Sequence, residues 1–181
     1  MRRAALIAAA VIALGASGVG AYQLAPSPAQ TSAHWREIAW PFPRDGWPAG
    51  RAFRCERGGC GGAELYVRAK LGFCNCDRGV ADDDEVDRVT DLDLITPRFA
   101  PSAPGQEIRV GDMQGRVRRY DLVMPGGRSH TASGIALSRR CDLFVAVVQG
   151  GGEAVATQSA AVEFLEAQEM KRWIVAALDG R

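Results

Sequence analysis

Histidine is scarce in this sequence, and the familiar motifs of enzymes are missing. Two histidines occur among 181 residues, which leaves few imidazoles for acid–base catalysis or metal binding. The glycine-rich stretches at 58–62 and 150–152 lack the pattern of a P-loop or a dinucleotide-binding loop. Ser129 and Asp121 lie near His130, but no nucleophile elbow accompanies them. The sequence therefore favours a protein that is not an enzyme, with a hydrolase as a minor alternative.

An excess of charge of either sign is also missing. The chain has 22 lysines and arginines against 21 acidic residues, a formal net charge of +1. Without Arg2 and Arg3, 20 basic residues stand against 21 acidic ones. Proteins dedicated to nucleic acids carry a basic surface that neutralises phosphates. We therefore expect no nucleic-acid partner.

The long uncharged run of the sequence lies at its N-terminus. Arg2 and Arg3 precede the apolar stretch Ala4–Ala16, and small residues follow at Ser17–Ala21. This order is typical of a signal peptide that is removed near residue 21. Alternatively, the 19 residues Ala4–Tyr22 form an uncleaved anchor, since they just reach the length that a bilayer requires. In both cases the arginines stay in the cytoplasm and the rest is exported. We expect a periplasmic or secreted domain, or one that the N-terminal segment anchors to the inner membrane.

The exported part is expected to comprise a linker and one domain. Residues 22–33 are rich in proline, serine and alanine, which is typical of a tether. Residues 34–181 are enough for a single domain with its own core. Alternating apolar residues and turn signals predict strands at 51–55, 64–73, 108–110, 117–124, 133–138 and 142–149.

Two helices are expected beside these strands. Residues 82–90 predict a short helix that Asp82 caps. Residues 160–178 predict a long C-terminal helix, with one apolar stripe formed by Phe164, Ala167, Met170, Ile174 and Ala177. Strands joined by tight turns and followed by a long helix indicate the α+β class, with an antiparallel β-sheet packed by helices.

Two further segments have unusual compositions. Residues 34–48 alternate tryptophans with prolines, and we expect an irregular segment that lies across the sheet and caps the core. Residues 82–93 hold seven acidic side chains, but the spacing and glycine of an EF-hand are missing. We therefore interpret them as the solvated, capped start of a helix rather than a calcium site.

Five cysteines carry the clearest candidate chemistry. Cys55, Cys60, Cys74 and Cys76 fall within 22 residues, and Cys141 opens an apolar strand. In an exported protein, structural disulfides are the first interpretation. The four clustered cysteines are the disulfide candidates, and Cys141 is the expected odd thiol. The connectivity stays open, because four paired cysteines allow three connectivities for each choice of the odd one.

Two alternatives use the same cluster as thiols. Four thiolates from Cys55, Cys60, Cys74 and Cys76 could hold zinc, or copper in its univalent state, although the spacings match no common zinc ribbon. Alternatively, Cys74 and Cys76 could exchange a disulfide, because a strained, exposed bond is a strong oxidant. The default interpretation requires no cofactor.

The cysteine-containing region also carries a resemblance. The stretches Trp40–Pro43, Gly50–Cys55, Glu64–Cys76 and Arg140–Asp142 resemble a family of uncharacterised exported proteins from alphaproteobacteria. The resemblance extends into the final helix and implies export and the extent of the domain, with no established activity. In element order alone, the chain is also similar to PsbP-like α/β/α sandwich domains.

These observations give two hypotheses about function. The first is a periplasmic accessory or binding domain that disulfides stabilise and that assists assembly or stress tolerance of the envelope. Its protein partner is left open. The second is a thiol-dependent protein that binds metal or exchanges disulfides through the cysteine cluster.

Overall fold

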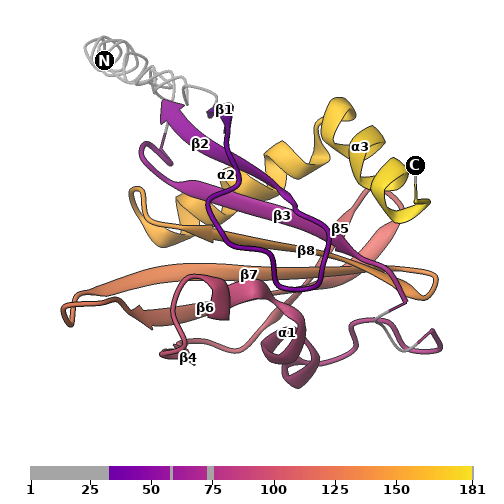
Figure 1. The fold of residues 1–181 in the computed structure, drawn as a ribbon, viewed down its shortest axis with the longest axis horizontal. Helices are drawn as coiled ribbons and strands as arrows, with labels where there is room; N and C mark the ends of the chain where they lie inside the picture. The colour runs from indigo at the N-terminus through magenta and orange to yellow at the C-terminus, as the bar shows by residue number, and fades with distance from the viewer. Residues whose placement is uncertain (1–32, 58, 73–75, 181) are drawn as a thin grey trace, which may run out of the picture.

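The computed structural model describes residues 33–57, 59–72 and 76–180 (Figure 1). The predicted targeting segment, 1–21, lies outside the described residues, as does all but the last residue of the predicted linker, 22–33. The strands are β1 (His34–Ile38), β2 (Arg51–Arg57), β3 (Glu64–Lys70), β4 (Phe99–Pro101), β5 (Gln106–Val110), β6 (Met113–Val123), β7 (Ser129–Arg139) and β8 (Asp142–Gln149). The helices are α1 (Asp83–Val89), the 3-10 helix η1 (Asp91–Leu94), α2 (Ala154–Glu166) and α3 (Gln168–Leu178).

All eight strands form one antiparallel sheet in the order β1-β2-β3-β8-β7-β6-β4, and β5 pairs with β6 beside β4. The predicted α+β class with an antiparallel sheet is therefore confirmed. Strand β3 pairs with the last strand, β8, and this pairing joins the N-terminal strands to the β6–β7–β8 meander. Because sequence alternation does not encode strand order, this join could not be predicted from the sequence.

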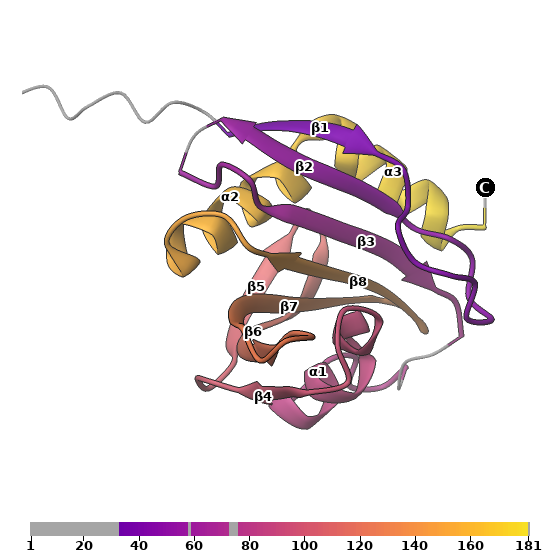
Figure 2. The ribbon, with the colours of Figure 1, turned by 60° about the vertical axis from the view of Figure 1, so that its left-hand side comes forward.

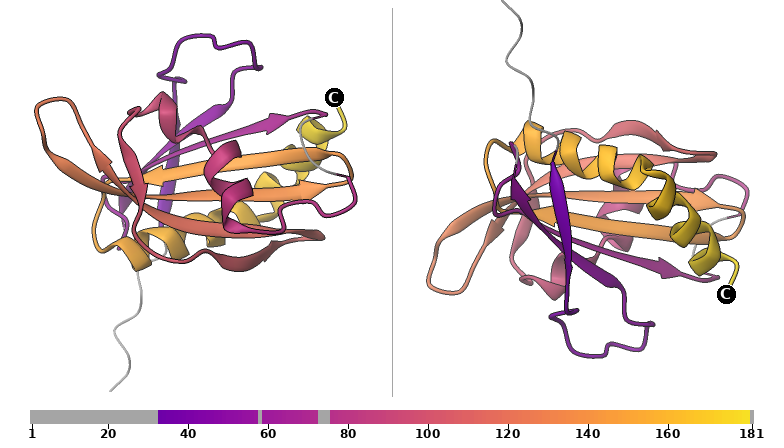
Figure 3. Two further views of the ribbon diagram at one scale, coloured as in Figure 1. Left: turned by 90° about the horizontal axis from the view of Figure 1, so that it is seen from below. Right: turned by 90° about the horizontal axis from the view of Figure 1, so that it is seen from above.

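Helices cover both faces of the sheet (Figures 2 and 3). Helices α2 and α3 lie over one face, where Leu165, Met170 and Ile174 pack on Phe144 and Ile135 in the main apolar cluster. Helix α1 and η1 lie against the other face, where two smaller apolar clusters form. The sheet is consequently a buried middle layer over much of its area, and β8 is apolar on both sides.

The C-terminal helix differs from the prediction. It starts earlier, at Ala154, and is divided at Ala167, whose backbone is extended with a ψ of 140°. The predicted inward positions Met170 and Ile174 are buried in α3, and Leu178 rather than Ala177 completes their stripe.

The tryptophan- and proline-rich segment is also more regular than expected. Its start forms the edge strand β1, in which Trp35 pairs with Cys55 of β2. The rest, residues 39–50, forms a strap over β3, where Trp40 and Phe42 make edge-on ring contacts with Tyr66. A short strand, β4, also lies at Phe99–Pro101, where no strand was predicted.

Candidate functional site

One disulfide joins Cys55, in β2, to Cys60, in the turn before β3. Both residues are buried, with exposures of 1% and 0%. The backbone N–H of Cys55 donates to the Ala63 carbonyl at 2.8 Å, and that of Ala63 donates to the Cys60 carbonyl at the same distance. The bond therefore fixes the β2–β3 turn from inside the core.

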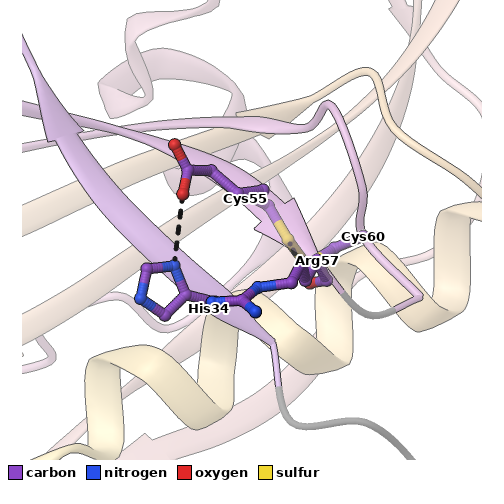
Figure 4. Close-up of a disulfide and its surroundings, with 5 residues drawn as sticks. His34, Cys55, Arg57 and Cys60 are labelled. Carbon is purple, nitrogen blue, oxygen red and sulfur yellow. Dashed lines mark hydrogen bonds and ion pairs between the residues drawn. A yellow bond between two sulfur atoms is a disulfide. The ribbon is translucent and has the colours of Figure 1, made fainter.

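Figure 4 shows His34 of β1 and Arg57 of β2 near this disulfide. His34 of β1 places its Nδ1 3.5 Å from the Glu56 carboxylate. Both side chains are well exposed, so this contact contributes little stability. The surroundings are those of a structural staple, since a buried disulfide is hard for an external thiol to reach.

The second disulfide joins Cys76 to Cys141. The prediction of Cys141 as the odd thiol is therefore wrong. Lys70 of β3 pairs with Leu143 of β8, so the chain leaving β3 passes beside the β7–β8 turn that holds Cys141. The backbone N–H of Gly72 donates to Asp142 at 2.6 Å and holds the two segments together. Unlike the first bond, this one joins two exposed residues.

The predicted cysteine cluster is divided by this arrangement. Cys55 and Cys60 lie near the start of β3, whereas Cys76 follows its end, and a strand of seven residues spans roughly 23 Å. The fourth member, Cys74, lies outside the described residues. Among the residues that are described, no group of three or more histidine, cysteine or acidic side chains could hold a metal ion.

The acidic residues of 82–93 are not all exposed to solvent, although the sequence predicted a solvated helix start. Asp82 caps α1 as predicted, by accepting from the Glu85 N–H at 2.9 Å. Asp83 accepts from the guanidinium of Arg116 at 2.7 Å. The N–H of Gly105 and then Arg116 lower the pKa of the Asp83 carboxyl. These carboxylates therefore dock α1 on the sheet.

A second contact of α1 involves Asp87, which accepts from Tyr120 Oη at 2.6 Å and from Arg118 at 2.8 Å. Burial and then the bond to Asp87 raise the pKa of the Tyr120 hydroxyl above its ordinary value. The hydroxyl stays protonated at neutral pH and acts as a donor.

A buried ionic network lies under the strap. Arg68 of β3, 3% exposed, contacts Asp91 Oδ2 at 2.5 Å and Asp45 Oδ2 at 2.7 Å. Lys70, also buried, contacts Asp91 Oδ1 at 2.7 Å. Two cations thus face two carboxylates, which compensates the cost of burying them. The hydrogen bonds from Arg68 lower the pKa of Asp45 to about 2.

This network pins the strap to the sheet. Asp45 lies in the strap, and the Trp40 and Trp47 rings of the same segment lie 6.0 Å from the Arg68 guanidinium and 5.8 Å from the Lys70 ammonium. The capping role predicted for these aromatics fits this arrangement. The network is internally paired, so we interpret it as structural.

His130 lines a cavity of about 340 Å³ between the start of β7, the Gly150–Gly152 turn and the start of α2. Ser133 lines it too, but its hydroxyl donates to Gln158 Oε1 at 3.1 Å. Side chains at odd and even positions of β7 point to opposite faces, so neither the predicted Ser129 nor Ser133 lies on the same face as His130. The geometry gives no support to the hydrolase alternative.

Comparisons with known proteins add little to this description. The chain matches no protein-family model, and a search of curated proteins also finds no match. Among solved structures, it is similar to a Pseudomonas aeruginosa protein of unknown function, PA94, with 14% identity and a TM-score of 0.36. That alignment covers 77% of this chain and 84% of the other. A likeness of this size supports no inference about function.

The fold and the two bonds define a disulfide-stabilised α+β domain. Within the described ranges, no helix is long and apolar enough to cross a membrane. What the protein does must be inferred from its own residues.

Proposed function

We propose that the chain is exported across the inner membrane and serves there as a disulfide-stapled accessory domain that binds another molecule. The observation that carries the proposal is the pairing of four of the five cysteines. Disulfides of this kind persist in oxidising compartments and are rare in the cytosol. The apolar run behind Arg2 and Arg3, and the resemblance to exported proteins, support the same location.

Expression of the full-length chain in a Gram-negative host tests the proposal. Cells are fractionated, and thiols are alkylated under denaturing conditions before and after reduction. We expect the protein outside the cytosol, with one thiol alkylated before reduction and all five afterwards, because four cysteines are paired. A matched variant that lacks residues 2–22 should stay in the cytosol with its thiols reduced.

The mass of the recovered protein distinguishes the two forms of export. Loss of about the first 21 residues indicates a signal peptide, and an intact chain in the membrane fraction indicates an anchor. An intact, soluble, cytosolic chain with five reduced thiols would contradict the proposal.

The exposure of Cys76 and Cys141 favours a second candidate function, thiol–disulfide exchange at that bond. A thiolate of a partner dithiol would attack one sulfur and form a mixed disulfide, and the other cysteine would leave as a thiol. The second thiol of the partner would then close the partner's disulfide and release a reduced Cys76–Cys141 pair. Two electrons pass from the partner to this protein.

Turnover separates exchange from a purely structural bond. With dithiothreitol as reductant and insulin as the disulfide substrate, an exchange protein should accelerate insulin reduction above the rate with dithiothreitol alone. The double variant Cys76→Ser/Cys141→Ser should lose the acceleration, and Cys55→Ser/Cys60→Ser should keep it. No acceleration by the unmodified protein would rule this candidate out and leave the accessory role intact.

A further inference from the structure

Arg119 of β6 is a half-buried cation whose guanidinium forms no ion pair within the described ranges. Its neighbours Arg116 and Arg118 point to the α1 face and pair with Asp83 and Asp87. Arg119 alternates to the opposite face, the one that Val117 shares with α2. There its guanidinium forms no hydrogen bond or ion pair with any residue that the structure describes, although its backbone carbonyl accepts from Ser102 N–H at 2.9 Å. A partly desolvated guanidinium gains more from an anion than a fully hydrated one does.

The side chain of Arg119 lines a cavity of about 310 Å³. The β4–β5 connection (103–105) and Gln106 at the start of β5 form one wall, and Val155 and Gln158 of α2 form another. Val117 of β6 lines it beside Arg119. This volume lies at the lower end of the range for small-molecule sites.

The lining combines a cationic end with an apolar body. Gln158 accepts from the Ser133 hydroxyl through Oε1, which leaves its Nε2 group available as a second donor. Val155 is 51% exposed, an unusual position for a large apolar side chain in this domain. It offers apolar surface next to the guanidinium, whereas Val117 lines the cavity with only 2% of its surface exposed.

The neighbouring Glu153 carboxylate caps α2 and forms no ion pair with Arg119 in the described structure. Glu153 lies close enough for Arg119 to help lower the pKa of its carboxyl, after the two backbone N–H groups that are the larger causes. Both of its oxygens cap α2, by accepting from Val155 N at 3.0 Å and Ala156 N at 2.9 Å. Asp121, on the same face of β6, is exposed and forms no ion pair with Arg119 in the described structure.

We propose that this cavity binds a carboxylate carried on a small apolar group, with Arg119 and the Gln158 amide as its donors. The inference rests on the binding role proposed above and specifies its ligand. Either a free organic acid or the C-terminus of a peptide could supply this chemistry. Arg119 holds the carboxylate, and Val155 contacts the apolar group.

The test is a titration of the full-length, oxidised protein followed by ¹H–¹⁵N NMR. N-acetyl-leucine is the probe, and its amide is the matched control, since it lacks only the charge. We expect saturable shifts in the amide signals of Ala103, Gly105, Gln106 and residues 155–158 with the acid. The amide should bind at least tenfold more weakly.

Variants identify the residue responsible. Arg119→Gln should weaken binding of the acid at least tenfold, whereas Arg109→Gln, at an exposed arginine of β5, should leave binding unchanged. Acetyl-Gly-Gly-Leu distinguishes the sources: tighter binding than N-acetyl-leucine indicates a peptide terminus, and equal or weaker binding indicates a free acid.

Three outcomes would overturn the inference: no saturable shift, equal binding of the amide, or unchanged binding by Arg119→Gln. The comparison of acid with amide uses the unmodified protein, so it decides the matter even if a variant folds poorly. Because export is measured by fractionation, a failure here is distinguishable from a failure of the proposed location.

Discussion

Removing the Cys76–Cys141 bond should destabilise the domain, because the unfolded chain has more conformational entropy without this cross-link. The bond closes a loop with a sequence separation of 65 residues, for which the chain-entropy estimate is about 4 kcal/mol. Both cysteines are exposed, so replacing them by alanine creates no cavity in the core. A loss of about 4 kcal/mol is a large part of the roughly 5–15 kcal/mol that stabilises a typical domain. The corresponding fall in Tm is roughly 8–16 °C.

Urea unfolding of Cys76→Ala/Cys141→Ala measures this effect, with Cys74→Ala in every variant to prevent exchange. The slope of the unfolding free energy against urea should rise, because the unfolded chain becomes less compact without the cross-link. Cys55→Ala/Cys60→Ala is the comparison. Its loop, with a separation of five residues, contributes about 2 kcal/mol, and its slope should hardly change.

Even if the two variants lose similar stability, the slope of the unfolding free energy against urea shows whether the entropy of the unfolded chain causes the loss. Cys55 and Cys60 are buried, so their replacement also removes apolar contacts and can add to the loss. A loss below about 1 kcal/mol for the Cys76–Cys141 variant, with an unchanged slope, would refute the argument from chain entropy.

Three smaller predictions concern the packing of the sheet. Asp45→Asn should remove about 1–2 kcal/mol at neutral pH, after allowance for the partial exposure of Asp45. Because the folded-state pKa of Asp45 is lowered to about 2, this stability is present above the ordinary pKa of 3.8 and is lost as the pH falls toward 2. Urea unfolding between pH 2 and 7 should therefore show a weaker acid dependence for the variant. Gly115→Ala would place a Cβ 1.9 Å from the Ala136 carbonyl oxygen and should cost about 3 kcal/mol in the same assay at pH 7. Tyr120→Phe removes the buried bond to the α1 carboxylate and should lower the unfolding free energy by about 1–2 kcal/mol, with little change in the circular dichroism spectrum.

The strands were predictable where a two-residue alternation or an apolar run was strong. Residues 142–149 form β8 as predicted, and 64–70 and 117–123 lie within predicted strands. Strand β1 was missed, because tryptophan and proline dominate its surroundings and its own residues carry three polar side chains out of five. An edge strand has one free side and needs less apolar pattern than a central strand.

The division of the C-terminal helix has a geometric cause that single-residue signals do not reveal. Helix α2 buries Thr157, Ala161 and Leu165, and α3 continues with Met170. A step of five residues in a continuous helix would turn Met170 by about 140° away from Leu165. The extended Ala167 restores the alignment, and neither glycine nor proline marks the break.

Only part of the candidate carboxylate site could be predicted from the sequence. Alternation along β6 already separates Arg119 from Arg116 and Arg118, because odd and even positions face opposite sides. The packing of α1 and α2 decides which face of β6 is covered by the acidic helix α1 and which face carries the cavity. That packing is a tertiary property.

Strand order decides the cysteine chemistry as well. Strand β3 separates Cys55 and Cys60 from Cys76, and Cys141, distant in the sequence, meets Cys76 because β3 pairs with β8. A four-thiolate site would require Cys55 and Cys60 to leave the core at one end of that strand and reach Cys76 beyond the other. Any exchange with an external dithiol must begin at the exposed bond, since the sulfurs of Cys55 and Cys60 are covered. The structural staple and the reactive candidate are therefore two separate bonds.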